Sequence, residues 1–182
     1  MIGKIFPKSS GSFEGRIKYI FGLSKHDHAI SKIALIDSNS VTPSPLPAIQ
    51  AGDKSVVEAM VEEFDSVEKM RAMTIDSDKK IKPVFHAMLS LRPGESLMHD
   101  QWQQAVRMYM SALGFVESCK YVAVLHEDTD HQHVHIVANR IRLEDGFRMV
   151  KDSEERTKTV DSVSRIEDTL GLVKSPKPSE TW

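Results

Sequence analysis

The sequence has little of what marks secreted or membrane proteins. It contains one cysteine, Cys119, in 182 residues, which excludes an internal disulfide framework and fits a reducing compartment. No apolar run approaches the roughly 20 residues that a membrane-spanning helix needs. Residues 1–4 lack the long apolar core of a secretory signal peptide. We therefore expect a cytoplasmic protein that is not inserted in a membrane.

An excess of one charge sign is also missing. The formal net charge is −2, so the overall charge does not indicate nucleic-acid binding, although residues 1–50 hold six basic against three acidic side chains. The length and the 40% hydrophobic content are typical of one globular domain. We expect this domain to span residues 1–173 and a flexible, proline-containing tail to span residues 174–182.

Apolar periodicity and turn residues predict the elements of the domain. Helices are expected over 13–21, 54–73, 99–113 and 153–170, the first capped by Ser12. Strands are expected over 1–6, 83–91, 121–125, 133–143 and 147–150. This order predicts an α+β two-layer fold, in which a mainly antiparallel sheet carries helices on one side and functional side chains on the other.

Four of the eight histidines lie within residues 126–135. The apolar run 121–125 before them and the alternating run after them predict two strands of a hairpin. Side chains alternate along a strand, so His133 and His135 share one face, and His126 at the end of the first strand can lie beside them. Three neutral imidazoles suit zinc, copper, nickel or iron and leave a coordination position open for a substrate. The spacing therefore predicts a metal site.

Two neighbours of these histidines leave alternatives open. His131 has the same parity as His133 and could replace His126 as the third ligand, although it lies nearest the turn. Asp128 could hold one imidazole in the required tautomer by accepting its second N–H, or it could be an ordinary turn aspartate.

Three segments, in chain order, carry a recognisable pattern: Ile17-Lys18-Tyr19-Ile20, then His86-Ala87-Met88-Leu89-Ser90-Leu91-Arg92-Pro93-Gly94-Glu95, then His126-x-Asp128-x-Asp130-His131-x-His133-Val134-His135-x-x-x-Asn139-Arg140. They resemble motifs I, II and III of plasmid relaxases, the conjugative mobilisation nucleases of the HUH endonuclease superfamily. The closest resemblance is to the P-type mobilisation branch, which includes T-DNA border endonucleases. Family members are usually longer, and the segment of about 24–82 matches no family pattern, which suggests a branch-specific insertion.

The resemblance implies a ferredoxin-like or RRM-like palm and a relaxase activity. Tyr19 would be the nucleophile that nicks single-stranded DNA at an origin of transfer, forms a 5′-phosphotyrosine and later rejoins the strand. A phenol ordinarily has a pKa of about 10, so a base must take its proton. Asp128 paired with a histidine is a candidate, and His126 could be this base instead of a metal ligand. His126, His133 and His135 would hold a divalent ion, Mg²⁺ or Mn²⁺, with Zn²⁺ or Ni²⁺ as alternatives.

The resemblance also suggests partners. Ser90, Arg92, Asn139 and Arg140 are candidate DNA contacts, although Asn139 and Arg140 could simply end a strand. Accessory relaxosome proteins and a type IV secretion coupling protein are expected, and the protein could travel with the transferred DNA. The alternatives are a rolling-circle replication initiator, which usually places its tyrosine after the histidines, a cupin oxygenase, which the helical patterns oppose, and a non-catalytic metal- or DNA-binding module.

Overall fold

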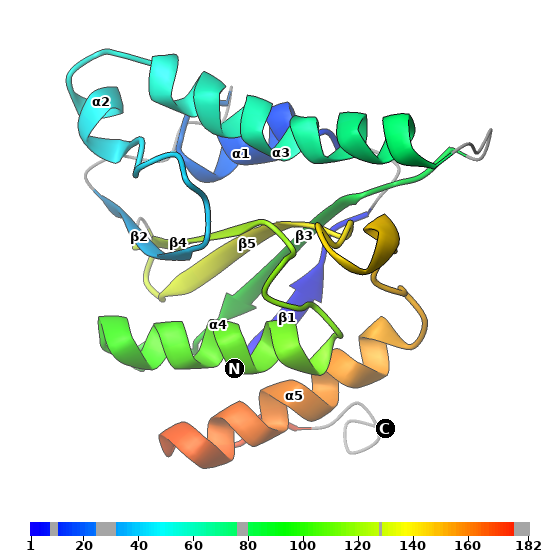
Figure 1. Ribbon diagram of the computed structural model, residues 1–182. Helices are drawn as coiled ribbons and strands as arrows, with labels where there is room; N and C mark the ends of the chain where they lie inside the picture. The colour runs from blue at the N-terminus through cyan, green and yellow to red at the C-terminus, as the bar shows by residue number, and fades with distance from the viewer. Residues whose placement is uncertain (8–10, 25–31, 76–79, 128, 177–182) are drawn as a thin grey trace.

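A five-stranded sheet forms the centre of the protein in the computed structural model, which describes residues 1–7, 11–24, 32–75, 80–127 and 129–176. The strand order is β1-β3-β5-β4-β2, and each neighbouring pair is antiparallel (Figure 1). This arrangement confirms the predicted α+β class with an antiparallel sheet. The strands are β1 (Ile2–Ile5), β2 (Ile33–Ser38), β3 (Val84–Ser90), β4 (Tyr121–His126) and β5 (His133–Asn139).

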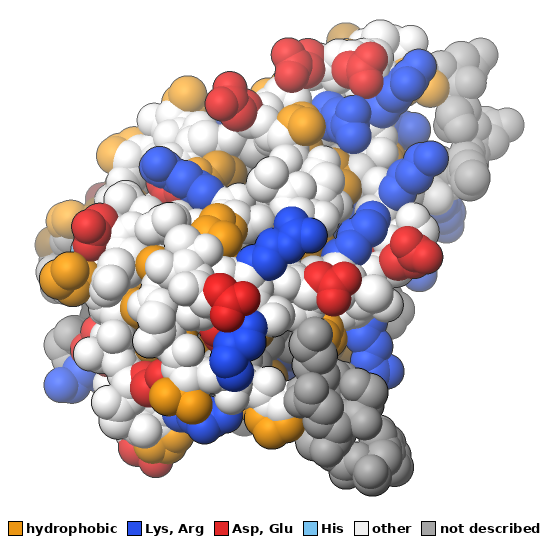
Figure 2. Space-filling view, turned by 90° about the horizontal axis from the view of Figure 1, so that it is seen from below, with side chains coloured by type: hydrophobic (Ala, Val, Ile, Leu, Met, Phe, Trp, Pro, Cys, Tyr) orange, Lys and Arg blue, Asp and Glu red, His pale blue; other side chains and the backbone are white. Residues whose placement is uncertain are grey.

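Helices α4 (His99–Ala112) and α5 (Glu155–Leu170) cover one face of the sheet (Figure 1). Their apolar stripes pack on the strands in a core that includes Trp102, Val106 and Ile166, all fully buried. In Figure 2, which views the molecule from that side, acidic and basic side chains are interspersed over the surface.

The prediction that helices pack on one side needs a correction. Helices α1 (Phe13–Ile20) and α3 (Ser55–Thr74) lie over the opposite face (Figure 1). Their apolar side chains need burial too, and they find it against the outward-facing valines of the central strands in a second core. The second face thus carries helices α1 and α3 as well as the histidines. The remaining short helices are α2 (Leu46–Gln50) and η3 (Asp145–Phe147).

The ends of the sheet differ from the sequence-based expectation in two places. β2 was not predicted, although it pairs with β4 along an edge and lies inside the segment of about 24–82. The predicted strand over 147–150 is reduced to one bridge, between Ile141 and Met149.

Within the described residues, no helix combines the length and the apolar character that crossing a membrane requires.

Candidate active site

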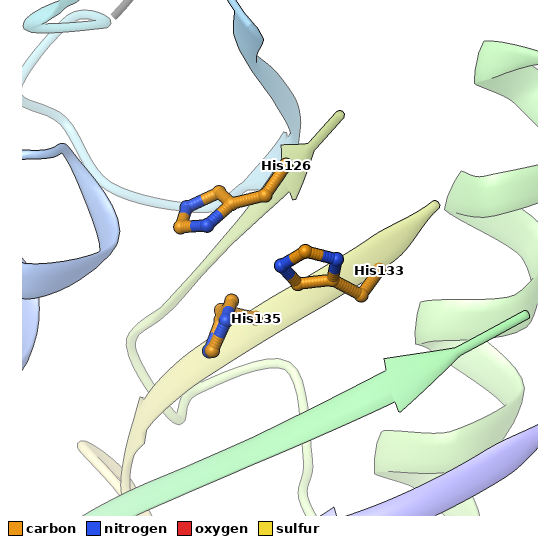
Figure 3. A group of neighbouring side chains, drawn as sticks. All are labelled: His126, His133 and His135. Carbon is orange, nitrogen blue, oxygen red and sulfur yellow. The ribbon is translucent and has the colours of Figure 1, made fainter. Parts of the chain in front are cut away.

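Three histidines meet at one end of the sheet. His126 is the last residue of β4 and His133 the first of β5, and the two are direct partners in the ladder. His135 lies two residues further along β5, on the same face. One ring nitrogen from each ring lies within 4.8 Å of the others, and all three side chains are buried (Figure 3). The register of a single hairpin therefore brings the three predicted ligands together.

Backbone carbonyls orient two of the three rings. His126 Nε2 lies 2.7 Å from the carbonyl oxygen of Ile20, and His133 Nδ1 lies 3.4 Å from that of His131. A carbonyl oxygen can only accept, so each of these nitrogens carries the ring proton and the other nitrogen keeps its lone pair. This is the usual arrangement around histidines that bind a metal.

The donor set fits a divalent ion. Three neutral imidazoles leave the charge of the ion undiluted, and imidazole nitrogens favour Ni²⁺ or Zn²⁺ over Mg²⁺ or Mn²⁺, which prefer oxygen. His131 is not brought into the group: its Nδ1 faces Asp130 Oδ1 at 2.8 Å, at the turn. Asp128 lies outside the described residues, so its predicted position next to the histidines stays a prediction.

Tyr19 lies beside the histidines. Ser12 caps α1 by accepting a hydrogen bond from the backbone N–H of Gly15, and the helix packs its apolar face into the second core. Tyr19 then lies at the end of the sheet where β4 ends at His126 and β5 begins at His133, which we call the open end. Its ring centroid is 5.5 Å from that of His135 in an edge-on arrangement. The structure thus brings the predicted nucleophile and the predicted metal ligands into one site.

Two side chains that sequence analysis did not assign complete this cluster. His86 on β3 lies with Nε2 2.8 Å from His135 Nδ1, and Arg16 Nη1 lies 3.2 Å from the Nδ1 of His86. Phe6 stacks on His86 with centroids 4.1 Å apart. Burial, followed by the positive charge of Arg16, lowers the pKa of His86 to about 3, so the ring is neutral at neutral pH. Strand parity could have found His86, because it shares a face with Ser90.

The four predicted DNA contacts fall into two pairs. Ser90 is the ladder partner of His133 and is half-buried at the open end of the sheet. Arg92 is exposed two residues further on and donates to the carbonyl oxygen of Lys174. Both positions are compatible with a bound strand near the histidines.

Asn139 and Arg140 are different, and their prediction as DNA contacts is corrected by burial. Asn139 lies about 20 Å along β5 from His133, beneath α3, where its amide donates to the carbonyl oxygen of Phe64. Arg140 is 2% exposed and forms an ion pair with Glu155 at the start of α5. Both side chains hold helices on the sheet.

Comparison with known proteins agrees with this geometry. The family model "Relaxase: MobA/VirD2-like, nuclease domain" matches residues 49–172, which include the three histidines but not Tyr19. Protein MobA of Acidithiobacillus ferrooxidans is 32% identical over 107 residues, covering 56% of this chain and 25% of that protein. The chain thus matches about a quarter of the length of this relative. No solved structure matches significantly. Because the family model spans well over half of the chain, the protein belongs to the MobA/VirD2-like relaxase family through its nuclease domain.

Proposed function

We propose that this chain is the nicking and joining domain of a plasmid mobilisation relaxase, with Tyr19 as the nucleophile. The observation that carries the proposal is the 5.5 Å separation of the Tyr19 and His135 rings at a buried group of three histidines. A phenol at that distance from a metal site can reach a phosphodiester that lies on the site. The substrate would be single-stranded DNA at an origin of transfer.

The reaction is a transesterification. The Tyr19 oxygen attacks the scissile phosphorus, a Tyr–O–P bond forms, and the bond from phosphorus to the 3′ oxygen of the preceding nucleotide breaks. The phenolic proton passes to a base, and the departing oxygen gains a proton to become a free 3′-hydroxyl. Because the ester bond is exchanged rather than hydrolysed, the same residue can rejoin the strand after transfer.

His126, His133 and His135 are the residues that would hold the divalent ion. When bound, this ion would supply positive charge beside the scissile phosphate and stabilise the charge that develops during phosphoryl transfer. Two of these histidines already donate their ring N–H to backbone carbonyls, which orients the rings before a ligand arrives. We assign the proton-accepting role to Asp128.

The DNA strand would lie over the open end of the sheet, beside Ser90 and within reach of Arg92. The opposite face is covered by α4 and α5 and carries interspersed charges, which also favours the histidine side. Accessory relaxosome proteins and a type IV secretion coupling protein would be the protein partners. The site of action would be the bacterial cytoplasm, where the plasmid DNA lies.

The proposal is tested with single-stranded oligonucleotides that tile the origin of transfer of the plasmid carrying the gene. Wild-type protein and Mn²⁺ should give a protein–DNA conjugate on a denaturing gel, and peptide mapping should locate it on Tyr19. Tyr19→Phe should still bind the oligonucleotide without forming the conjugate. Tyr121→Phe is the matched control and should form it.

Two outcomes contradict parts of this assignment. A conjugate on Tyr19→Phe would reject Tyr19 as the nucleophile. An undiminished wild-type conjugate in excess chelator would reject the metal requirement.

A further inference from the structure

His135 differs from the other two histidines in its outer contact. His126 and His133 face backbone carbonyls, whereas the Nδ1 of His135 faces the Nε2 of a second imidazole, His86, at 2.8 Å. On its far side, the Nδ1 of His86 faces Arg16 Nη1 at 3.2 Å. Arg16, His86 and His135 therefore form a continuous chain of three side chains that leads to the metal site.

The position of each proton in this chain follows from Arg16. A guanidinium has only donors, so the Nδ1 of His86 must accept its hydrogen bond. The neutral ring of His86 then carries its proton on Nε2 and donates it to the Nδ1 of His135. Because the Nδ1 of His135 accepts this hydrogen bond, the ring of His135 carries its proton on Nε2.

This tautomer is the wrong one for binding a metal. Because the Nδ1 of His135 faces His86, Nε2 is the nitrogen available to an ion, and a protonated nitrogen has no lone pair to give. His126 and His133 are held in the opposite state, with their protons on the carbonyl side. The cluster is thus prepared for a metal at two ligands and blocked at the third.

We propose that Arg16 and His86 form a latch on His135 that opens when a metal binds. The inference rests on the metal site proposed above. For the Nε2 of His135 to bind an ion, its proton must move to Nδ1, and His86 must then accept it at Nε2 and carry its own proton on Nδ1. That proton would face the donors of Arg16, so the hydrogen bond from Arg16 to His86 must break. Each ring stays neutral, and no net proton is gained or lost.

Packing favours an exchange of tautomers over a rotation of His86. The ring is 2% exposed, and Phe6 stacks on it with an interplanar angle of 16°. The ring therefore has little room to swing away from His135. The guanidinium of Arg16, which is 5.6 Å from the centre of the Phe6 ring and donates a second bond to the carbonyl oxygen of Pro7, is the part that can move.

The released guanidinium would lie on α1, one helical turn before Tyr19 and beside the histidines. Arg16 would then become available to the DNA backbone only in the metal-loaded site. Linkage makes this coupling reciprocal: a phosphate that draws Arg16 away from His86 should tighten metal binding by the same factor. Coupling of this kind is typically about 5- to 150-fold.

The latch is tested by ¹⁵N NMR of the histidine rings in the full chain, with Zn²⁺ as a diamagnetic probe. Ring nitrogen shifts distinguish the two neutral tautomers, and single His→Gln variants assign the signals. Without metal, His86 and His135 should both carry their protons on Nε2. With Zn²⁺, both should carry them on Nδ1.

Failure of the latch can be separated from failure of the metal site. If Zn²⁺ shifts His126, His133 and His135 but leaves the tautomer of His86 unchanged, the latch is wrong and the metal site stands. If Zn²⁺ shifts none of the three ligands, both are wrong.

Calorimetric titration with Zn²⁺ gives a second readout that does not depend on catalysis. Arg16→Met removes the donor and keeps an aliphatic chain against Phe6. Lys4→Met is the matched control, because Lys4 Nζ lies 5.0 Å from the centre of the same ring and its loss removes the same charge without touching His86. Arg16→Met should tighten Zn²⁺ binding at least several-fold more than Lys4→Met. Equal effects would show that only charge matters and would overturn the latch.

Discussion

The guanidinium of Arg140 and the carboxylate of Glu155 form an ion pair in the interior, where the two side chains are 2% and 10% exposed. The guanidinium also lies 5.1 Å from the centre of the Phe85 ring. This pair connects the end of β5 to the first turn of α5. Arg140 therefore contributes to the fold, and loss of DNA binding in an Arg140 variant has to be read together with its stability.

Breaking this pair from one side should be strongly destabilising. Glu155→Gln leaves a buried cation without its counter-charge, and such changes typically cost about 3–5 kcal/mol of unfolding free energy. Chemical denaturation measures this loss. Glu154→Gln, at the exposed neighbouring position, should change stability little. The double variant Arg140→Met/Glu155→Leu should recover most of the loss, and a single variant as stable as the wild type would contradict the role.

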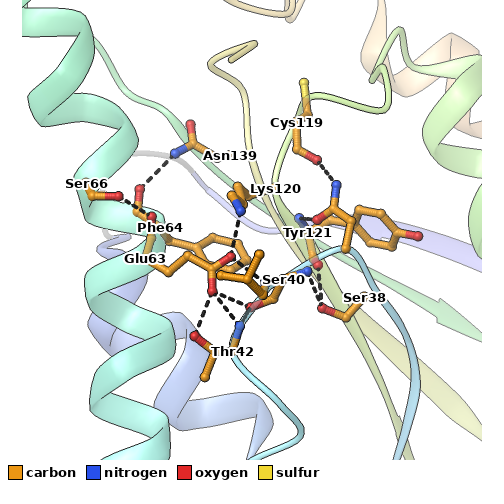
Figure 4. A network of polar contacts seen from close by, with 12 residues as sticks. Ser38, Ser40, Thr42, Glu63, Phe64, Ser66, Cys119, Lys120, Tyr121 and Asn139 are labelled. Atoms are coloured by element: carbon orange, nitrogen blue, oxygen red, sulfur yellow. Dashed lines mark hydrogen bonds and ion pairs between the residues drawn. The ribbon is translucent and has the colours of Figure 1, made fainter. Parts of the chain in front are cut away.

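Glu63 on α3 makes the stability of the folded protein depend on pH. Its carboxylate accepts hydrogen bonds from Ser40 and Thr42 and pairs with Lys120 at 2.7 Å (Figure 4). Burial alone would raise its pKa, but hydrogen bonds from Lys120, Ser40 and Thr42 lower the pKa to about 2. Because the pKa of Glu63 in the folded protein lies below the ordinary glutamate value of 4.5, this contribution to stability is complete above that value and is lost as the pH falls toward 2.

Glu63→Gln should remove this dependence. Its melting temperature should be lower than that of the wild type at pH 7, and the difference should shrink between about pH 4.5 and pH 2. Thermal denaturation over this range is the measurement, with the exposed Glu62→Gln as the control. A difference that stays constant down to pH 2 would show that Glu63 acts through packing alone.

The histidines should differ in their effect on metal affinity. His133→Ala or His135→Ala removes a ligand and should weaken Mn²⁺ or Zn²⁺ binding by more than the roughly 10- to 100-fold that loss of an outer contact costs. His131→Ala is the control, because its ring lies only 5.7 Å from that of His133 but stands outside the group of ligands. Calorimetric titration measures both. Equal losses for His131→Ala and His133→Ala would reject the ligand set.

The contact of β1 with α5 should not tolerate a side chain at Gly3. A Cβ there would lie 2.6 Å from Thr159 Cγ2, so Gly3→Ala should destabilise the protein by about 1–3 kcal/mol through overpacking. Thr159→Ser removes that methyl group and keeps the hydroxyl that bonds to Tyr109. Denaturation of Gly3→Ala/Thr159→Ser should show partial rescue. No rescue would place the strain elsewhere, for example at Val163, 3.3 Å from the same Cβ.

Local sequence patterns were sufficient to predict the helices and strands that have regular apolar spacing. The predicted helices over 13–21, 54–73 and 99–113 correspond closely to α1, α3 and α4, because each has a continuous apolar stripe and a clear start or stop signal. The alternating positions of His133 and His135 were sufficient to predict that both side chains lie on one face of the sheet. The position of His126 beside these two histidines followed from the register of one hairpin, which depends on residues that are close in the sequence.

Other features depend on tertiary contacts, which local sequence patterns do not predict. β2 was missed because a register shift between Leu35 and Asp37 interrupts its alternation. Asn139 shares the face of the histidines, but α3 covers it, and only the packed structure shows how far along the strand that cover reaches. Arg16 and His86 come from α1 and β3, and no local pattern indicates that they meet.

The pairing of His126 with His133 has a consequence for how this domain can vary. A residue added between the two strands leaves their ladder register unchanged, and with it the grouping of the three ring nitrogens. One residue added inside β5 would instead turn His135 toward α4, since successive side chains point to opposite faces. The grouping of the three histidines therefore tolerates a change of length between the two strands of this domain but not within β5.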